Sequence, residues 1–160
     1  MAKQRKANAK DARLILQLYD LRREEEMRKA RNFIGMQFNP QSVEEAMKVM
    51  TAFGTDENRW FRQVVSYWEM AASLVLRGTI NEELFFDSNG EIFFIYAKIK
   101  PVLPGLRKAM NSPEFLGQME KLIHRTPEGR RKLKVFEERI AQFSKMRAAA
   151  AGEGKQKYGT

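Results

Sequence analysis

The chain of 160 residues contains no cysteine, a single histidine, and only 5 proline and 10 glycine residues. The absence of cysteine excludes disulfide frameworks, thiolate zinc sites and cysteine nucleophiles. Low proline and glycine beside 43% hydrophobic residues exclude collagen-like and wholly disordered chains. No apolar run approaches the ~20 residues that a membrane-spanning helix needs, and the charged N-terminus has no apolar segment of the signal-peptide type. We therefore expect a folded cytoplasmic protein without a membrane span, of a size that suits one domain.

Several motifs of enzymes are also missing from the sequence. It contains no Gly-x-x-x-x-Gly-Lys phosphate loop, no Gly-x-Gly-x-x-Gly segment and no Gly-x-Ser-x-Gly element. Glu120 and His124 are four residues apart and could offer two ligands on one helical face, but metal sites usually need three or four. The sequence therefore predicts no catalytic residue, no cofactor and no bound metal.

Helical patterns cover most of the chain. A first, highly charged helix is predicted from residue 9 to residue 34, with its second half in solvent and Gly35 as its end. Ser42 and Glu45 form a capping box for a short second helix that ends at Gly54.

The segment from residue 57 to residue 77 is the most apolar helix predicted. At 100° per residue, its polar side chains fall within one stripe of roughly 120°, so about two thirds of the circumference is apolar. Such a helix must pack on several sides, and Gly78 is its predicted end. The residues expected in the core are Trp60, Val64, Trp68, Ala71 and Val75.

The segment from residue 79 to residue 111 allows two readings. Asn81 is a candidate N-cap for a short helix, and a second helical segment begins at Glu91. Asn89-Gly90 between aromatic stretches also fits a β-hairpin, although the apolar residues do not alternate with polar ones. Ser112 and Thr126, each followed by proline, predict the starts of two further helices.

These patterns together predict an all-α, single-domain bundle of five to seven helices around residues 57–77. We expect a disordered basic arm over residues 1–8, a helical domain over residues 9–150 and a disordered tail over residues 151–160.

The positive charge is concentrated at the two ends of the chain. The net charge of +9 divides into +5 for residues 1–34, −3 for residues 35–100 and +7 for residues 101–160. Basic ends of this kind bind nucleic acid through phosphates, or only keep a protein soluble. The candidate nucleic-acid-binding residues are Lys3, Arg5, Lys6, Lys10, Arg13, Arg130, Arg131, Lys132 and Lys134.

Glu69 is the most interesting carboxylate of the sequence. It lies at the edge of the polar stripe of the apolar helix, beside Trp68, where partial burial would raise its pKa and allow general acid or base chemistry. A structural ion pair is the alternative, with Arg107 as the first candidate partner and Arg77 as the second.

The stretch from Tyr67 to Leu84 has an aromatic-x-Glu helix that ends in Arg-Gly, followed by the acidic pair Glu82-Glu83 and, further on, Pro101 and Arg107. In these features the chain resembles a family of small helical bacterial proteins described as a domain of unknown function. The resemblance implies a helical fold and no site residues. Some members have a membrane-spanning N-terminus, where this chain has a charged helix.

Three hypotheses for the function follow. The first is a non-enzymatic helical interaction module that docks on a macromolecular partner through its charged N-terminal and basic C-terminal helices. The second is a salt-sensitive binder of nucleic acid or ribonucleoprotein without sequence specificity. The third is an enzyme with a polar pocket around Glu69. The sequence leaves the partner, a protein or a polyanion such as RNA or DNA, and the oligomeric state undetermined.

Overall fold

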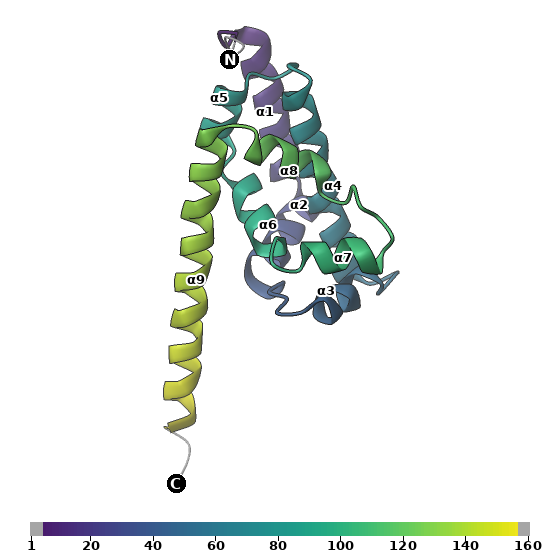
Figure 1. The fold of residues 1–160 in the computed structure, drawn as a ribbon, viewed down its shortest axis with the longest axis vertical. Coiled ribbons are helices and arrows are strands. Elements are labelled where there is room, and N and C mark those ends of the chain that lie inside the picture. The colour runs from purple at the N-terminus through teal and green to yellow at the C-terminus, as the bar shows by residue number, and fades with distance from the viewer. Residues whose placement is uncertain (1–4, 157–160) are drawn as a thin grey trace.

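The computed structural model describes residues 5–156, and all regular structure in this range is helical (Figure 1). The predicted all-α class is therefore confirmed. The described range holds more helices than the five to seven expected, because loops divide several predicted segments into shorter ones. The elements are α1 (Ala9–Arg23), α2 (Glu25–Asn32), the π-helical turn η1 (Phe33–Gln37), α3 (Val43–Met50), α4 (Asp56–Leu76), α5 (Glu82–Ser88), α6 (Glu91–Ile99), α7 (Leu103–Ala109), α8 (Gly117–His124) and α9 (Pro127–Gln156).

Helix α4 is the centre of the core, as its apolar circumference predicts. It packs against α2, α3, α5, α8 and η1. Val64, Trp68, Ala71 and Val75 are buried as expected. Trp60 is only half-buried, contrary to expectation, because its indole lies at the edge of the core and donates to the Glu26 carboxylate over 3.4 Å.

The N-terminal helix is not continuous, contrary to the prediction for residues 9–34. The backbone of Glu24 is extended, with ψ at 142°, and its carboxylate accepts hydrogen bonds from the first amides of α2. The second half is exposed to solvent on one side only, because Met27 and Ala30 are buried where α2 packs on α4. The chain changes direction so that α1 packs on α5 and α2 on α4. Gly35 does not end the segment either, since it lies within η1.

The segment that allowed either a hairpin or two helices is helical. The Asn81 side chain caps α5 by accepting from the Leu84 amide over 2.9 Å, and α6 follows after the turn at Asn89-Gly90. The predicted helix start at Ser112 is wrong. Residues 113–116 form turns, and α8 begins only after Leu116, whose φ of 58° is left-handed.

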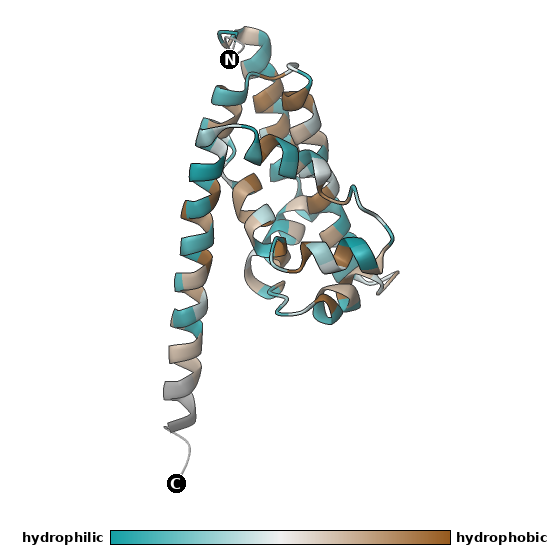
Figure 2. Cartoon of the chain, in the orientation of Figure 1, coloured by the Kyte–Doolittle hydropathy of each residue, from teal (hydrophilic) through white to brown (hydrophobic). Residues whose placement is uncertain are grey.

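Helix α9 begins as predicted, with the Thr126 hydroxyl accepting from the Gly129 amide over 3.1 Å. Its 30 residues would span roughly 45 Å. The first half packs on α6 and α8, with Leu133 buried and the Phe136 ring stacked on Phe93 at 6.0 Å. The second half extends past the other helices (Figure 1). Figure 2 shows apolar residues of the first half on the side that faces the rest of the chain.

The structure describes part of the expected arm and part of the expected tail. Residues 5–8 are not a loose arm, because the Arg5 guanidinium pairs with Asp11 and Asn8 caps α1. At the other end, residues 151–156 of the expected tail are the last residues of α9. The remaining residues of the expected arm and tail, 1–4 and 157–160, lie outside the described range. Among the described helices, none combines the length and the apolar character needed to cross a membrane.

Candidate functional site at the junction of α6 and α9

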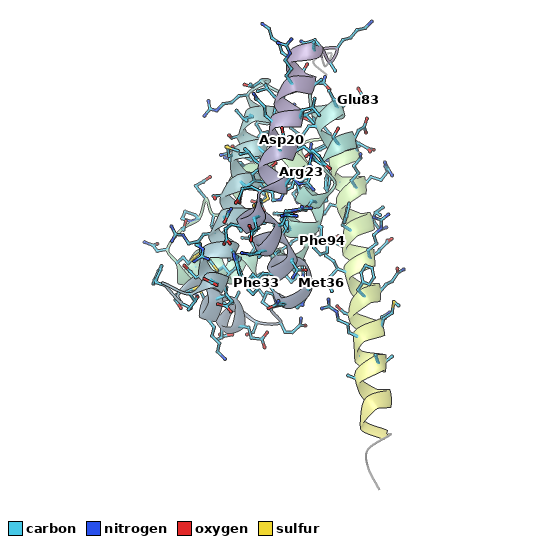
Figure 3. The ribbon with its side chains drawn as sticks, turned by 180° about the vertical axis from the view of Figure 1, so that it is seen from behind. Asp20, Arg23, Phe33, Met36, Glu83 and Phe94 are labelled. Atoms are coloured by element: carbon cyan, nitrogen blue, oxygen red, sulfur yellow. The ribbon has the colours of Figure 1, made fainter. Side chains whose placement is uncertain are left out.

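A pocket of about 330 Å³ lies where α9 leaves the rest of the fold. We call it the junction pocket, because η1, α6 and α9 and the loop after η1 each contribute side chains. Figure 3 shows two of its residues, Met36 and Phe94, on the part of the fold next to α9. The lining residues are Gly35, Met36, Asn39, Phe94, Lys98, Ile140, Phe143, Ser144 and Arg147.

Helical spacing explains why these side chains meet. Phe94 and Lys98 are one turn apart on α6, and Ile140, Phe143 and Arg147 follow one another at steps of three and four on α9. On the third wall, the wide turn of η1 ends with the Phe38 amide donating to the Phe33 carbonyl over 3.0 Å. Single π-helical turns are frequent at functional sites.

Lys98 is the polar centre of the pocket. Only 7% of the residue is exposed, and its Nζ donates to the carbonyls of Ile34 over 2.6 Å and Gly35 over 3.0 Å. Nζ also lies 5.1 Å from the centre of the Phe94 ring. An ammonium group has three protons, so the two carbonyls leave one donor for another acceptor.

The pocket carries uncompensated positive charge. Burial, together with the nearby Arg147 guanidinium, lowers the pKa of Lys98 to about 8. Lys98 is thus still mainly protonated at pH 7. The lining includes no acidic residue, and neither Lys98 nor Arg147 forms an ion pair with any residue between 5 and 151. A buried cation without a counter-ion is costly, so an anionic ligand would lower the free energy of this site.

A second polar cluster lies beside the pocket, with one carboxylate between two guanidinium groups. The Glu91 carboxylate pairs with Arg22 over 2.8 Å and with Arg31 over 2.6 Å. This hydrogen-bonded pairing raises the pKa of Arg31. Since the three side chains belong to α6, α1 and α2, the cluster ties these helices together.

The predicted ion pair of Glu69 with an arginine is wrong. Both carboxylate oxygens of Glu69 accept from backbone amides at the start of α8, those of Gln118 over 3.2 Å and Met119 over 2.8 Å. Free amides at a helix N-terminus bind a carboxylate well. Arg77 is exposed at the end of α4, and Arg107 pairs elsewhere.

Glu69→Ala is expected to lower the free energy of unfolding by about 1–2 kcal/mol, the usual cost of losing a helix cap. Glu69→Gln should lower it less, because one amide oxygen remains to accept. Urea unfolding followed by circular dichroism measures both values. Glu138→Ala, an exposed change on α9, is the control and should stay within about 0.5 kcal/mol of the unmodified chain. An equally small effect of Glu69→Ala would show that Glu69 does not stabilise α8.

Arg107 instead belongs to a cluster between α6, α7 and α8. Its guanidinium donates to Glu120 over 2.7 Å and to the Phe115 carbonyl over 3.0 Å, and the Tyr96 hydroxyl donates to Glu120 over 3.1 Å. Hydrogen bonds from Arg107 lower the pKa of Glu120, while burial raises the pKa of Tyr96. His124 lies beside Tyr96 with ring centres 5.8 Å apart. No cluster of His, Asp and Glu suited to a metal occurs among the described residues.

Several of the nine candidate basic residues are already paired within the fold. Arg5 binds the fully buried Asp11, and this interaction holds the pKa of Asp11 far below its usual range. Arg131 pairs with Glu128, Lys132 lies 3.6 Å from Asp87, and Arg130 donates to the His124 carbonyl. Lys3 lies outside the described range. Among the nine, the side chains left exposed without an ionic partner in the described range are those of Lys6, Lys10, Arg13, Arg130 and Lys134.

Sequence reasoning missed the junction pocket. The available signal was Lys98 itself, a single charged residue in the apolar stretch from Ile92 to Ile99. A lysine in such a stretch is either at the surface or buried with polar partners. The sequence does not show that carbonyls of η1 are the partners of Lys98, because Ile34 is 64 residues away in the chain.

Comparison with known proteins gives one match. A family described as "Domain of unknown function (DUF4760)" matches residues 7–126, which include all of α1 to α8. The match confirms the resemblance found around residues 67–107 and extends it. No curated protein and no solved structure matches the chain. The junction pocket thus has walls from the matched region and a wall from α9, which follows it.

Proposed function

Since the chain belongs to this DUF4760 family, whose function is unknown, we propose a function from its own surface. It is a non-enzymatic helical interaction module that docks on a protein partner through the second half of α9 and the junction pocket at its base. We call residues 141–151 of α9 the projecting segment.

The observation that carries this proposal is the exposure of large apolar side chains on and beside the projecting segment. Phe143 is 58% exposed, Met146 66% and Met36 of η1 60%. Every residue from 141 to 151 is exposed. Isolated helices of about this length are marginal in water, and contact with a partner would stabilise the segment. Exposed aromatic and methionine side chains at one place are typical of interfaces.

The charge of the projecting segment indicates what kind of partner fits. It contains Lys145 and Arg147 and no acidic residue. A second copy of the chain would bring the same positive charges against it, which is unfavourable. An acidic protein surface with an apolar ridge complements the segment in both charge and polarity.

The other two hypotheses find less support. Glu69 offers no free carboxylate oxygen for chemistry, because both accept backbone amides. Three of the basic residues at the ends, Arg5, Arg131 and Lys132, are already paired with carboxylates within the fold. The N-terminal helix α1 exposes Leu16 and Tyr19, but it lies toward the opposite end of the molecule from the projecting segment (Figure 1). One compact partner surface would therefore contact α9 rather than both helices.

A photo-activated cross-linking residue tests the proposal. It is placed at position 143 and, as a control, at position 53, where an exposed phenylalanine follows α3. In cells that express the chain, we expect a protein adduct at 143 and not at 53. The protein identified is then purified, and Phe143→Ser should weaken its binding at least about tenfold while Phe53→Ser does not. Nuclease-sensitive adducts, adducts with a second copy, or equal binding by both variants would contradict the proposal.

A further inference from the structure

We propose that the junction pocket binds a monocarboxylate with a medium-length hydrocarbon chain, the carboxylate lying between Lys98 and Arg147. This ligand goes beyond the protein partner proposed above, and its binding can be measured without that partner.

The two cations define the charged end of the ligand. Lys98 is nine-tenths buried, has one donor left after its bonds to Ile34 and Gly35, and faces no acidic residue in the lining. Arg147 lines the same pocket from α9 and can donate two parallel hydrogen bonds to a carboxylate. One carboxylate thus offsets one of the two positive charges in the lining and supplies the acceptor that Lys98 lacks.

The remaining walls define the apolar end. Met36, Phe94, Ile140 and Phe143 come from three different helical elements and surround the space beside the cations. The volume of about 330 Å³ is at the small end of the range for ligand pockets. A hydrocarbon chain of medium length suits these walls.

Calorimetric titration of the full chain with octanoate tests the proposal. Octanol, which has the same chain and no charge, is the matched ligand control. We expect octanoate to bind at least about tenfold more tightly than octanol. Only the carboxylate of octanoate can form hydrogen bonds between charged groups with Lys98 and Arg147. Equal binding of the two ligands, or no binding of octanoate, would overturn the proposal.

Three variants locate the site. Lys98→Met is expected to weaken octanoate binding about tenfold or more, and Arg147→Gln about threefold or more. Lys108→Met removes an exposed lysine on α7 and should leave binding unchanged. Circular dichroism checks that each variant is folded. If Lys98→Met does not fold, Arg147→Gln, which changes an exposed side chain, tests the proposed site alone. Unchanged binding by folded Lys98→Met or Arg147→Gln would contradict the proposed site.

The affinity should also depend on pH in a definite direction. Lys98 loses its proton above a pKa of about 8, and Arg147 is the other charged residue in the pocket lining. The neighbouring Glu91 is already paired with Arg22 and Arg31. Octanoate binding is therefore expected to weaken between about pH 7 and pH 10. A constant affinity over this interval would show that Lys98 does not contact the carboxylate.

Discussion

Replacing Trp68 with alanine is expected to lower the free energy of unfolding by about 3–5 kcal/mol. The side chain is fully buried at the centre of α4, so its removal leaves a cavity in the core. The Arg22 guanidinium also loses the indole face that it covers at 5.3 Å. One smaller effect acts in the opposite direction, because the Trp68 indole N–H has no acceptor among the described residues and its removal relieves that cost.

Urea unfolding followed by circular dichroism measures this effect. The control is Met70→Ala, two residues further along α4, where the side chain is exposed. It should change the free energy of unfolding by no more than about 0.5 kcal/mol. A loss below about 1 kcal/mol for Trp68→Ala would mean that α4 is not the centre of the core.

A chain that ends at Ile140 is expected to fold as the full chain does but to bind the partner more weakly. The residues removed from α9 up to residue 151 are exposed, so the midpoint of urea unfolding should hardly change. The affinity for the partner identified by cross-linking should fall about thirtyfold or more, because interface anchors such as Phe143 typically contribute 2 kcal/mol or more. Surface plasmon resonance with the purified partner measures the affinity.

A variant of full length controls for the loss of chain length. Phe143→Ser combined with Met146→Ser keeps the helix and removes both exposed apolar side chains. It should weaken binding nearly as much as the truncation. Full affinity of the truncated chain would place the docking surface elsewhere on the molecule.

The sequence predicted those parts of the fold that depend on local signals. The apolar circumference of α4 and the caps at Asn81 and Thr126 are encoded within a few residues of where they act, and all three are confirmed. The break at Glu24 is different. The basic residues at the end of α1 and the acidic residues at the start of α2 fit a break, but they equally fit the i,i+4 ion pairs of one continuous helix. The packing of Met27 and Ala30 on α4 is visible only in the tertiary structure.

The partners of polar side chains were the least predictable feature. Glu69 binds the amides of a helix some 50 residues further along the chain, and a search for charged side chains cannot reveal backbone donors. Lys98 likewise binds carbonyls of a π-helical turn that the sequence predicted as a helix end. Both cases involve free backbone groups at helix termini, which only the tertiary arrangement brings within reach of a side chain.

Hydrogen exchange of the projecting segment, with and without the partner, tests the central claim most directly. In the free chain, the amides of residues 141–151 should exchange rapidly, because nothing in the described fold covers them. Saturation with the partner should slow their exchange at least about tenfold, while the amides of α4 in the core remain unchanged. Slow exchange already in the free chain, or no change on binding, would contradict a docking surface on α9.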